Sequence, residues 1–181
     1  KKEREQTKSF EEAFNKLKNN YTNLLELVCT LNVNQLNKNL EADKWSCGQI
    51  MEHLQMSFGF TILYLNKKIS QPELIPVAGF KSTLRYLLIK FVLNSPIKVK
   101  APKGVDNVPE VTTIEQIKQG VNKNLQALEE FINRYPVELN QKAIFKHPLA
   151  GRINLYQTIQ FLNDHLMHHD RQIRQIISKL H

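Results

Sequence analysis

Apolar residues recur at steps of three and four residues over four long stretches of this chain. In the first stretch, from about Glu5 to Leu31, seven of them follow one another in this way: Phe10, Phe14, Leu17, Tyr21, Leu24, Val28 and Leu31. Such steps place side chains on one face of an α-helix, and that face must be buried against another element. We find no convincing strand pattern. Four amphipathic helices therefore predict an all-α protein.

Capping signals mark where the other three helices begin. In each, a Ser, Thr or Asn precedes a Glu or Gln by three residues, which is the spacing of a capping box. These signals are Ser46 with Gln49, Thr112 or Thr113 with Glu115 or Gln116, and Asn154 with Gln157. The second helix is predicted to continue to Ile69 and the third to end before Pro136. The fourth is predicted to run to the C-terminus.

The connection between the second and third helices is too long for a tight antiparallel turn. It covers about 40 residues, contains a predicted short helix from about Ser82 to Leu93, and then passes through a proline-marked loop. The expected fold is a four-helix bundle with a long crossover connection and a short extra helix. At 181 residues, the chain is expected to form a single domain over residues 1–181.

Charge and composition narrow the classes of partner. The net charge of +8 would suit nucleic acid, but the lysines are scattered and are not interleaved with aromatic residues, so nucleic acid is not an expected partner. No apolar run reaches the roughly 18 residues that span a bilayer, so no membrane partner is expected. The N-terminal stretch lacks the apolar region of a signal peptide. With only Cys29 and Cys47, a reducing, cytoplasmic location is expected.

Histidines occupy core-facing positions in two of the predicted helices. In the stretch FLNDHLMHHD, at about 100° per residue, His169 falls about 20° and His165 about 60° from Leu162, which marks the buried stripe. His168 lies about 120° away, toward the flank. In the second helix, His53 shares a face with Ile50, Ser57, Phe60 and Tyr64, and this face is also expected to be buried.

Three inward histidines call for a common explanation, because burying an imidazole without a partner costs free energy. One explanation is a divalent metal ion, for which neutral imidazoles are ligands, and an i,i+4 pair sets two ring nitrogens at one site. The three nearest ring nitrogens are then expected to lie within about 4 Å of one another. The alternative is that each is a hydrogen-bonded core histidine. These residues alone leave both explanations open.

Three segments together resemble the DinB/YfiT-like superfamily of small metal-binding helical-bundle proteins. They are KWSCGQIMEHL, VKAPKGVDNVP, and the long stretch from FKHPLAGRINLYQ to DRQIRQI, in that order along the chain. The resemblance implies a divalent metal held by His53, His165 and His169, with Zn or Ni favoured over Fe, Mn or Co. It also suggests that Gln172 orients a ligand or bound water, whereas its alternative is an exposed helix residue. His147, in the HP…G loop, matches a structural position.

The resemblance also suggests two bacterial chemistries that use an open position on a Lewis-acid metal. One is S-transfer from a small-molecule thiol to an electrophile, and the other is metal-dependent hydrolysis. We favour the thiol S-transferase, because no glutamate base accompanies the histidines in an HExxH pattern. The third alternative is a non-enzymatic stress or binding protein in which a bound metal stabilises the helical bundle. Tyr64 is a candidate pocket residue, no catalytic residue is assigned, and a homodimer is left open.

Overall fold

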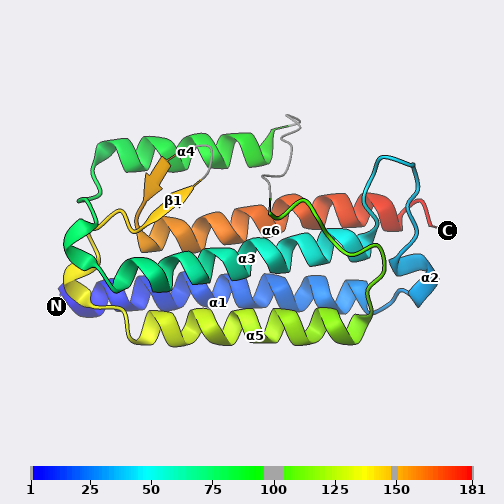
Figure 1. Ribbon diagram of the computed structural model, residues 1–181, viewed down its shortest axis with the longest axis horizontal. Coiled ribbons are helices and arrows are strands. Elements are labelled where there is room, and N and C mark those ends of the chain that lie inside the picture. The colour runs from blue at the N-terminus through cyan, green and yellow to red at the C-terminus, as the bar shows by residue number, and fades with distance from the viewer. Residues whose placement is uncertain (1, 96–103, 148–150, 181) are drawn as a thin grey trace.

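Four long helices make up most of the protein. The computed structural model describes residues 2–95, 104–147 and 151–180, with the side chains of residues 2–7 left out. The long helices are α1 (Lys2–Val28), α3 (Cys47–Ile69), α5 (Ile114–Asn133) and α6 (Leu155–Ile177), drawn in Figure 1. The predicted all-α class is confirmed, since helices account for most of the described residues.

Shorter elements occupy the connections. They are α2 (Val33–Leu36), a 3₁₀ turn η1 (Pro72–Leu74), α4 (Phe80–Asn94), a second 3₁₀ turn η2 (Val137–Leu139), and the strands β1 (Phe145–His147) and β2 (Gly151–Ile153). Helix α4 is the predicted short extra helix, two residues longer at its N-terminal end and one residue longer at its C-terminal end. Helix α2 was not predicted from the sequence, since four residues are too few to show a helical period.

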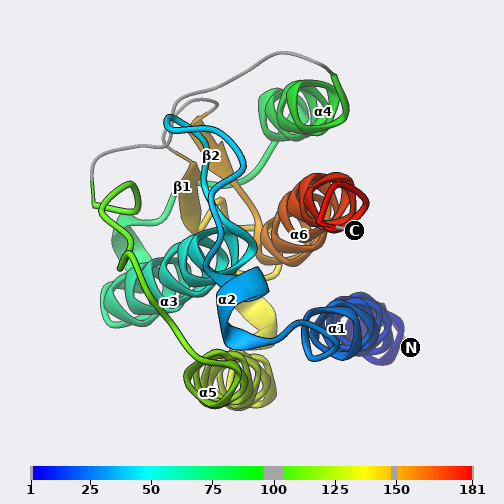
Figure 2. The same ribbon diagram turned by 90° about the vertical axis from the view of Figure 1, so that its right-hand side faces the viewer.

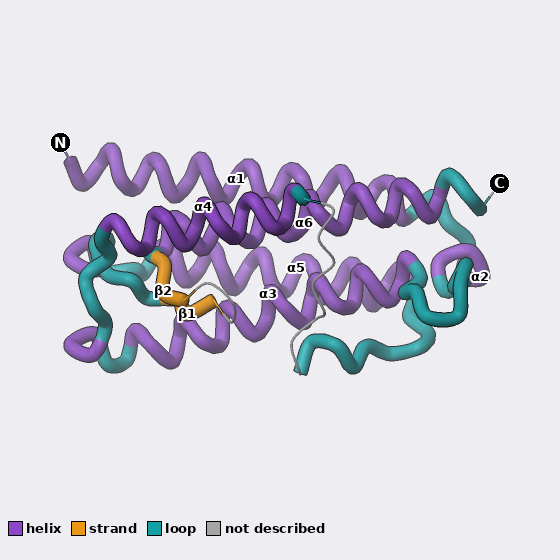
Figure 3. The backbone as a smooth tube through the Cα atoms, turned by 90° about the horizontal axis from the view of Figure 1, so that it is seen from above, coloured by secondary structure: helices purple, strands orange, loops and turns teal. Residues whose placement is uncertain are grey.

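The crossover connection sets the directions of the helices. Seen end on, α1, α6, α3 and α5 form a closed ring in which each packs against the next, and α4 lies outside the ring against α6 (Figure 2). Because α4 carries the chain back along the bundle, α3 and α5 run in the same direction, as do α1 and α6 (Figures 1 and 3). Helices α3 and α6 are therefore antiparallel neighbours, and this pair carries the site described below.

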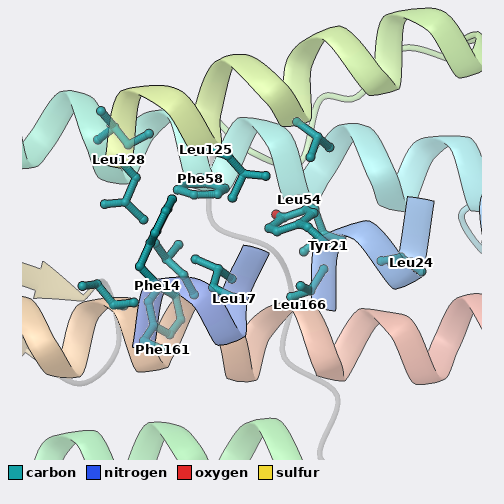
Figure 4. Close-up of a cluster of buried hydrophobic side chains, with 14 of the residues drawn as sticks. Phe14, Leu17, Tyr21, Leu24, Leu54, Phe58, Leu125, Leu128, Phe161 and Leu166 are labelled. Atoms are coloured by element: carbon teal, nitrogen blue, oxygen red, sulfur yellow. The ribbon is translucent and has the colours of Figure 1, made fainter. Parts of the chain in front are cut away.

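The stripes predicted from the sequence form the core. All seven apolar residues predicted for α1 are buried, with Leu17, Leu24 and Val28 completely inaccessible. They meet apolar side chains of α3, α5 and α6, including Phe58, which stacks on Tyr21 with ring centroids 5.7 Å apart (Figure 4). Burial of an aromatic or aliphatic side chain contributes about 1.5–3 kcal/mol, so this shared core supplies the main stabilisation of the bundle.

The predicted capping boxes all form. The hydroxyl of Ser46 accepts a hydrogen bond from the Gln49 N–H at 3.2 Å, and the Gln49 side chain accepts one from the Ser46 N–H at 3.0 Å. The same reciprocal pairs cap α5 at Thr113 and α6 at Asn154. Thr112, the other candidate, is instead buried. The end of α3 at Ile69 agrees with the prediction, whereas α1 ends at Val28, three residues earlier than predicted.

The expectation that no strands are present was wrong. Strands β1 and β2 pair antiparallel, with Phe145 opposite Ile153 and His147 opposite Gly151. Each strand has three residues, which is too short for the alternating pattern that identifies a strand in a sequence. Gly151 has φ of +83°, a conformation that favours glycine, as expected for a turn position. Pro148, assigned to the same turn, lies outside the described residues.

Helix α4 has apolar side chains on two opposite faces. Tyr86 and Ile89 are buried against the bundle, while the outer face exposes a row of large apolar residues: Phe80, Leu84, Leu87, Leu88 and Phe91. None of the helices in the described part of the chain combines the length and apolar character that crossing a membrane requires. Cys29 is exposed, Cys47 is buried, and both are free thiols.

Candidate metal centre

Three histidines from two neighbouring helices converge inside the bundle. His53 lies in α3, and His165 and His169 lie one turn apart in α6. Each offers a ring nitrogen, and the three nitrogens all lie within 4.8 Å of one another. The spread is slightly larger than the expected 4 Å. The structure thus brings together the three residues that the sequence placed on inward faces.

The orientation of His53 is set by a backbone carbonyl on a distant segment. His53 is only 4% exposed, and its Nδ1–H donates to the carbonyl oxygen of Val105 at 2.7 Å. A carbonyl oxygen can only accept, so Nδ1 carries the proton and Nε2 keeps its lone pair. The indole of Trp45, just before α3, lies against the imidazole with ring centroids 5.0 Å apart. His53 is therefore held in the tautomer that can bind a metal through Nε2.

A chain of hydrogen bonds sets the tautomer of His169. Nδ1–H of His168 donates to the carbonyl oxygen of Leu93, in the last turn of α4, at 2.7 Å. Nε2 of His168 then accepts from the side-chain amide of Gln172 at 3.0 Å. The amide oxygen of Gln172 is left to accept from Nδ1–H of His169 at 2.8 Å. His169 consequently has an unprotonated Nε2, as a metal ligand requires.

His165 completes the cluster from the turn before His169. The two Nε2 atoms lie 3.1 Å apart. Two ligands of a tetrahedral zinc ion with Zn–N bonds of 2.0–2.1 Å lie roughly 3.4 Å apart, so this pair is already near the required spacing. The ring of Phe161 stacks on His165 with centroids 5.7 Å apart and an angle of 14° between the planes. This contact fixes the plane of the imidazole.

Burial keeps all three imidazoles in the neutral form. It is the main cause that lowers the pKa of His169 to about 3, with the nearby His53 as a further cause. The pKa of His165 is held well below its ordinary value by burial and then by His169 and His53. The pKa of His53 is also lowered by burial, although its hydrogen bond to Val105 acts in the opposite direction. Neutral imidazole is the form that coordinates a metal.

The donor set fits a divalent metal ion. Three neutral imidazole nitrogens, two of them with the tautomer set by hydrogen bonds, are the ligands found in open three-histidine sites. Such a set leaves a further coordination position and does not discriminate strongly among the later first-row divalent metals. Each of the three histidines has a hydrogen-bond partner in the structure, since Nε2 of His165 lies within hydrogen-bond distance of Nε2 of His169. The core-histidine alternative accounts for these hydrogen bonds, whereas a metal ion also accounts for the convergence of the three rings.

The remaining candidate residues lie at different distances from the cluster. Gln172 is half-buried, and its side chain contacts His169 directly, so it is not a solvent-exposed helix residue. Tyr64 lies about 16 Å further along α3 than His53, and its ring packs against Phe145 with centroids 5.4 Å apart. Its role as a pocket residue stays a prediction. His147 lies in β1, with its ring 4.7 Å from that of Phe161.

Two contacts at the site were not identified from the sequence. Val105 contributes through its backbone carbonyl, which leaves no side-chain signal. His168 was expected on the flank, and it is there, but its function as the partner of Gln172 depends on the carbonyl of Leu93, 75 residues earlier.

A comparison with known families gives one match. The family model described as the DinB superfamily matches residues 16–173, a range that includes the three histidines and Gln172. No curated protein matches the chain, and no solved structure matches it.

Proposed function

The chain belongs to the DinB superfamily, and we propose that it is a metal-dependent transferase that joins a small thiol to a small electrophile. The observation that carries the proposal is the convergence of ring nitrogens of His53, His165 and His169, all within 4.8 Å of one another. A divalent ion bound there would keep its full charge of +2, because all three ligands are neutral, and would lower the pKa of a thiol that binds to it.

The reaction needs little from the protein beyond binding and orientation. A thiolate sulfur forms a bond to the electrophilic carbon, the bond from that carbon to the leaving group breaks, and the leaving group departs with the electron pair. The thiol proton passes to solvent. The ring of Trp45 lies beside His53 and is only half-buried, so it offers an apolar surface against which a small organic electrophile could pack.

The carboxylates nearest the ligands in sequence support thiol transfer over hydrolysis. Each is bonded to a group outside the cluster: Glu52 to the Thr112 hydroxyl, Asp164 to the Tyr86 hydroxyl at 3.0 Å, and Asp170 to Arg174 at 2.9 Å. The described residues show no carboxylate within the histidine cluster. A hydrolase of the zincin type places a glutamate there as general base. A thiol requires no such base once its pKa is lowered.

The test measures thiol consumption against a chromogenic electrophile such as 1-chloro-2,4-dinitrobenzene. Protein reconstituted with Zn or Ni and supplied with cysteine, glutathione or another low-molecular-weight thiol is expected to exceed the buffer rate, and removal of the metal should abolish the excess. His53→Gln should lose both bound metal and rate. His147→Gln, which changes a histidine outside the cluster, should retain both.

The contrary outcome is metal binding with no thiol-dependent rate for any thiol tested. In that case the transferase is rejected while the metal site stands, and hydrolysis of ester and amide substrates by the same samples becomes the next measurement. If hydrolysis is also absent, the remaining explanation of the site is a non-enzymatic binding protein in which the metal stabilises the bundle.

A further inference from the structure

A cavity lined by three cationic side chains lies at the N-terminal end of α4. Its volume is about 390 Å³, and its walls come from the segment before α4, the first turns of α4 and strand β2. The walls are held together by backbone hydrogen bonds, from the Ala78 N–H to the Gln141 carbonyl at 2.6 Å and from the Ala143 N–H to the Pro76 carbonyl at 2.8 Å. The cavity is thus part of the folded framework.

The cations of the cavity have no acidic partner in the described part of the chain. Lys81, Arg85 and Arg152 line it, and no carboxylate does. None of the ion pairs found within the described residues involves any of the three. Nη1 of Arg152 is buried and has no hydrogen-bond partner among the residues that the structure describes. Three cations that share one cavity without a carboxylate would be stabilised by an anion from outside the chain.

Arg85 packs against strand β2 in the wall of the cavity. Gly151 has φ of +83°, and a Cβ at that position would lie 3.1 Å from Nε of Arg85. The guanidinium of Arg85 therefore packs over the backbone of the residue next to Arg152. Both arginines line the same cavity, and like charges repel each other. A bound anion would remove that repulsion.

The charges favour phosphate over a carboxylate. Guanidinium groups bind both kinds of anion through paired N–H donors. A phosphate monoester carries about −1.5 to −2 charges at pH 7, which matches three cations better than the single charge of a carboxylate. The first turn of α4 also lines the cavity, and its N-cap Gly79 supplies no side-chain hydrogen bond. The positive end of the helix dipole adds to the attraction.

The other side of the cavity is apolar. Val77 and Phe80 line it, and their side chains are 70% and 82% exposed, so a ligand could cover them. We propose that this cavity binds a phosphate group carried by an apolar or aromatic molecule, with Lys81, Arg85 and Arg152 holding the phosphate. The site is separate from the histidine cluster, because Arg85 lies about 12 Å along α4 from Leu93, the residue that contacts His168.

Calorimetric titration of the metal-loaded protein with phenyl phosphate, inorganic phosphate and benzoate tests the proposal. Phenyl phosphate is expected to bind at least about tenfold more tightly than benzoate. Arg152→Gln and Arg85→Gln should each weaken its binding by about tenfold or more, which corresponds to the loss of a charge-assisted contact. Lys90→Gln, which removes an exposed cation of α4 outside the cavity, is the matched control and should bind as the unmodified protein does.

The phosphate could come from a soluble ester or from a lipid headgroup, and vesicle flotation separates these sources. Binding to phosphatidic acid vesicles but not phosphatidylcholine vesicles, lost in Arg152→Gln, would support the site with a headgroup as ligand. Phenyl phosphate binding without flotation would support it with a soluble ester. The proposal fails if neither probe binds, or if Lys90→Gln weakens binding as much as Arg152→Gln. Arg152→Lys, which keeps the charge, serves where Arg152→Gln does not fold, and it should bind more weakly than the unmodified protein.

Discussion

Acidification of the metal-free protein should destabilise it well above the pH at which carboxylates titrate. The pKa of His169 is lowered to about 3 in the folded protein, against an ordinary value of 6.5 when unfolded. Between these values the unfolded chain binds the proton and the folded protein does not, so stability is complete above pH 6.5 and falls as the pH is lowered. The loss is about 1.4 kcal/mol for each pH unit below 6.5.

His165 should contribute the same slope, because its pKa is also held well below 6.5. Between pH 7.5 and 5.5 these two histidines together account for a loss of about 3 kcal/mol. His53 and His147, whose pKa values are also lowered by burial, add to the loss in the same direction. A domain with a total stability of about 5–15 kcal/mol would lose a substantial part of it.

Urea denaturation at pH 7.5, 6.5 and 5.5, in the presence of a chelator, measures this loss. In His165→Asn and His169→Asn, the free energy of unfolding should fall less steeply below pH 6.5, by about 1.4 kcal/mol per pH unit for each residue replaced. If both variants showed the pH dependence of the unmodified protein, these imidazoles would titrate alike in the folded and unfolded states, and the argument from burial would be wrong.

Three further predictions concern the ligands, their hydrogen-bond partner and the core. His168→Ala should leave the metal content of untagged protein unchanged by elemental analysis, whereas His169→Ala should reduce it sharply; equal losses would contradict the assignment of ligands on α6. Gln172→Leu should weaken metal affinity by about 10–100-fold in a chelator competition, because Nδ1–H of His169 loses its acceptor, and an unchanged affinity would show that this hydrogen bond is dispensable. Phe58→Ala should lower the free energy of unfolding, measured by urea denaturation, by about 3–5 kcal/mol. Leu63→Ala, at a position 65% exposed in the same helix, should change it by less than about 0.5 kcal/mol. Similar effects of the two substitutions would mean that the core is misassigned.

The helices and their caps could be predicted because the causes are local. The stripe of α1 contains seven apolar residues at steps of three and four, and each capping box involves residues only three apart, so both are visible in the sequence. The face of α3 was less well predicted. Phe60 was placed on the buried face with His53, but its side chain is 50% exposed. Neighbouring elements decide how far a buried face extends, and the helical period alone does not define that limit.

The ligand histidines could be predicted, but what holds them could not. Their inward positions follow from the helical period, and the family resemblance selected the same three residues. The tautomer of His53 depends on the carbonyl of Val105, 52 residues away, and that of His169 depends, through Gln172 and His168, on the carbonyl of Leu93, 75 residues from His168. Every residue has a carbonyl, so such partners appear only when the chain is folded. The same applies to the cavity at α4, which is lined by Arg85 and Arg152 although they are 67 positions apart in the sequence.

The division of the histidines between α3 and α6 has a consequence for synthesis on the ribosome. His165 follows His53 by 112 residues, which takes about 6–22 s to translate at 5–20 residues per second. During this interval, α1 and α3 have emerged but lack α6, the helix against which both pack. The nascent chain therefore carries exposed apolar faces and only one of the three clustered histidines until α6 is translated. Metal loading must follow release of α6, so a chaperone that covers α1 and α3 would act before metal uptake and not after it.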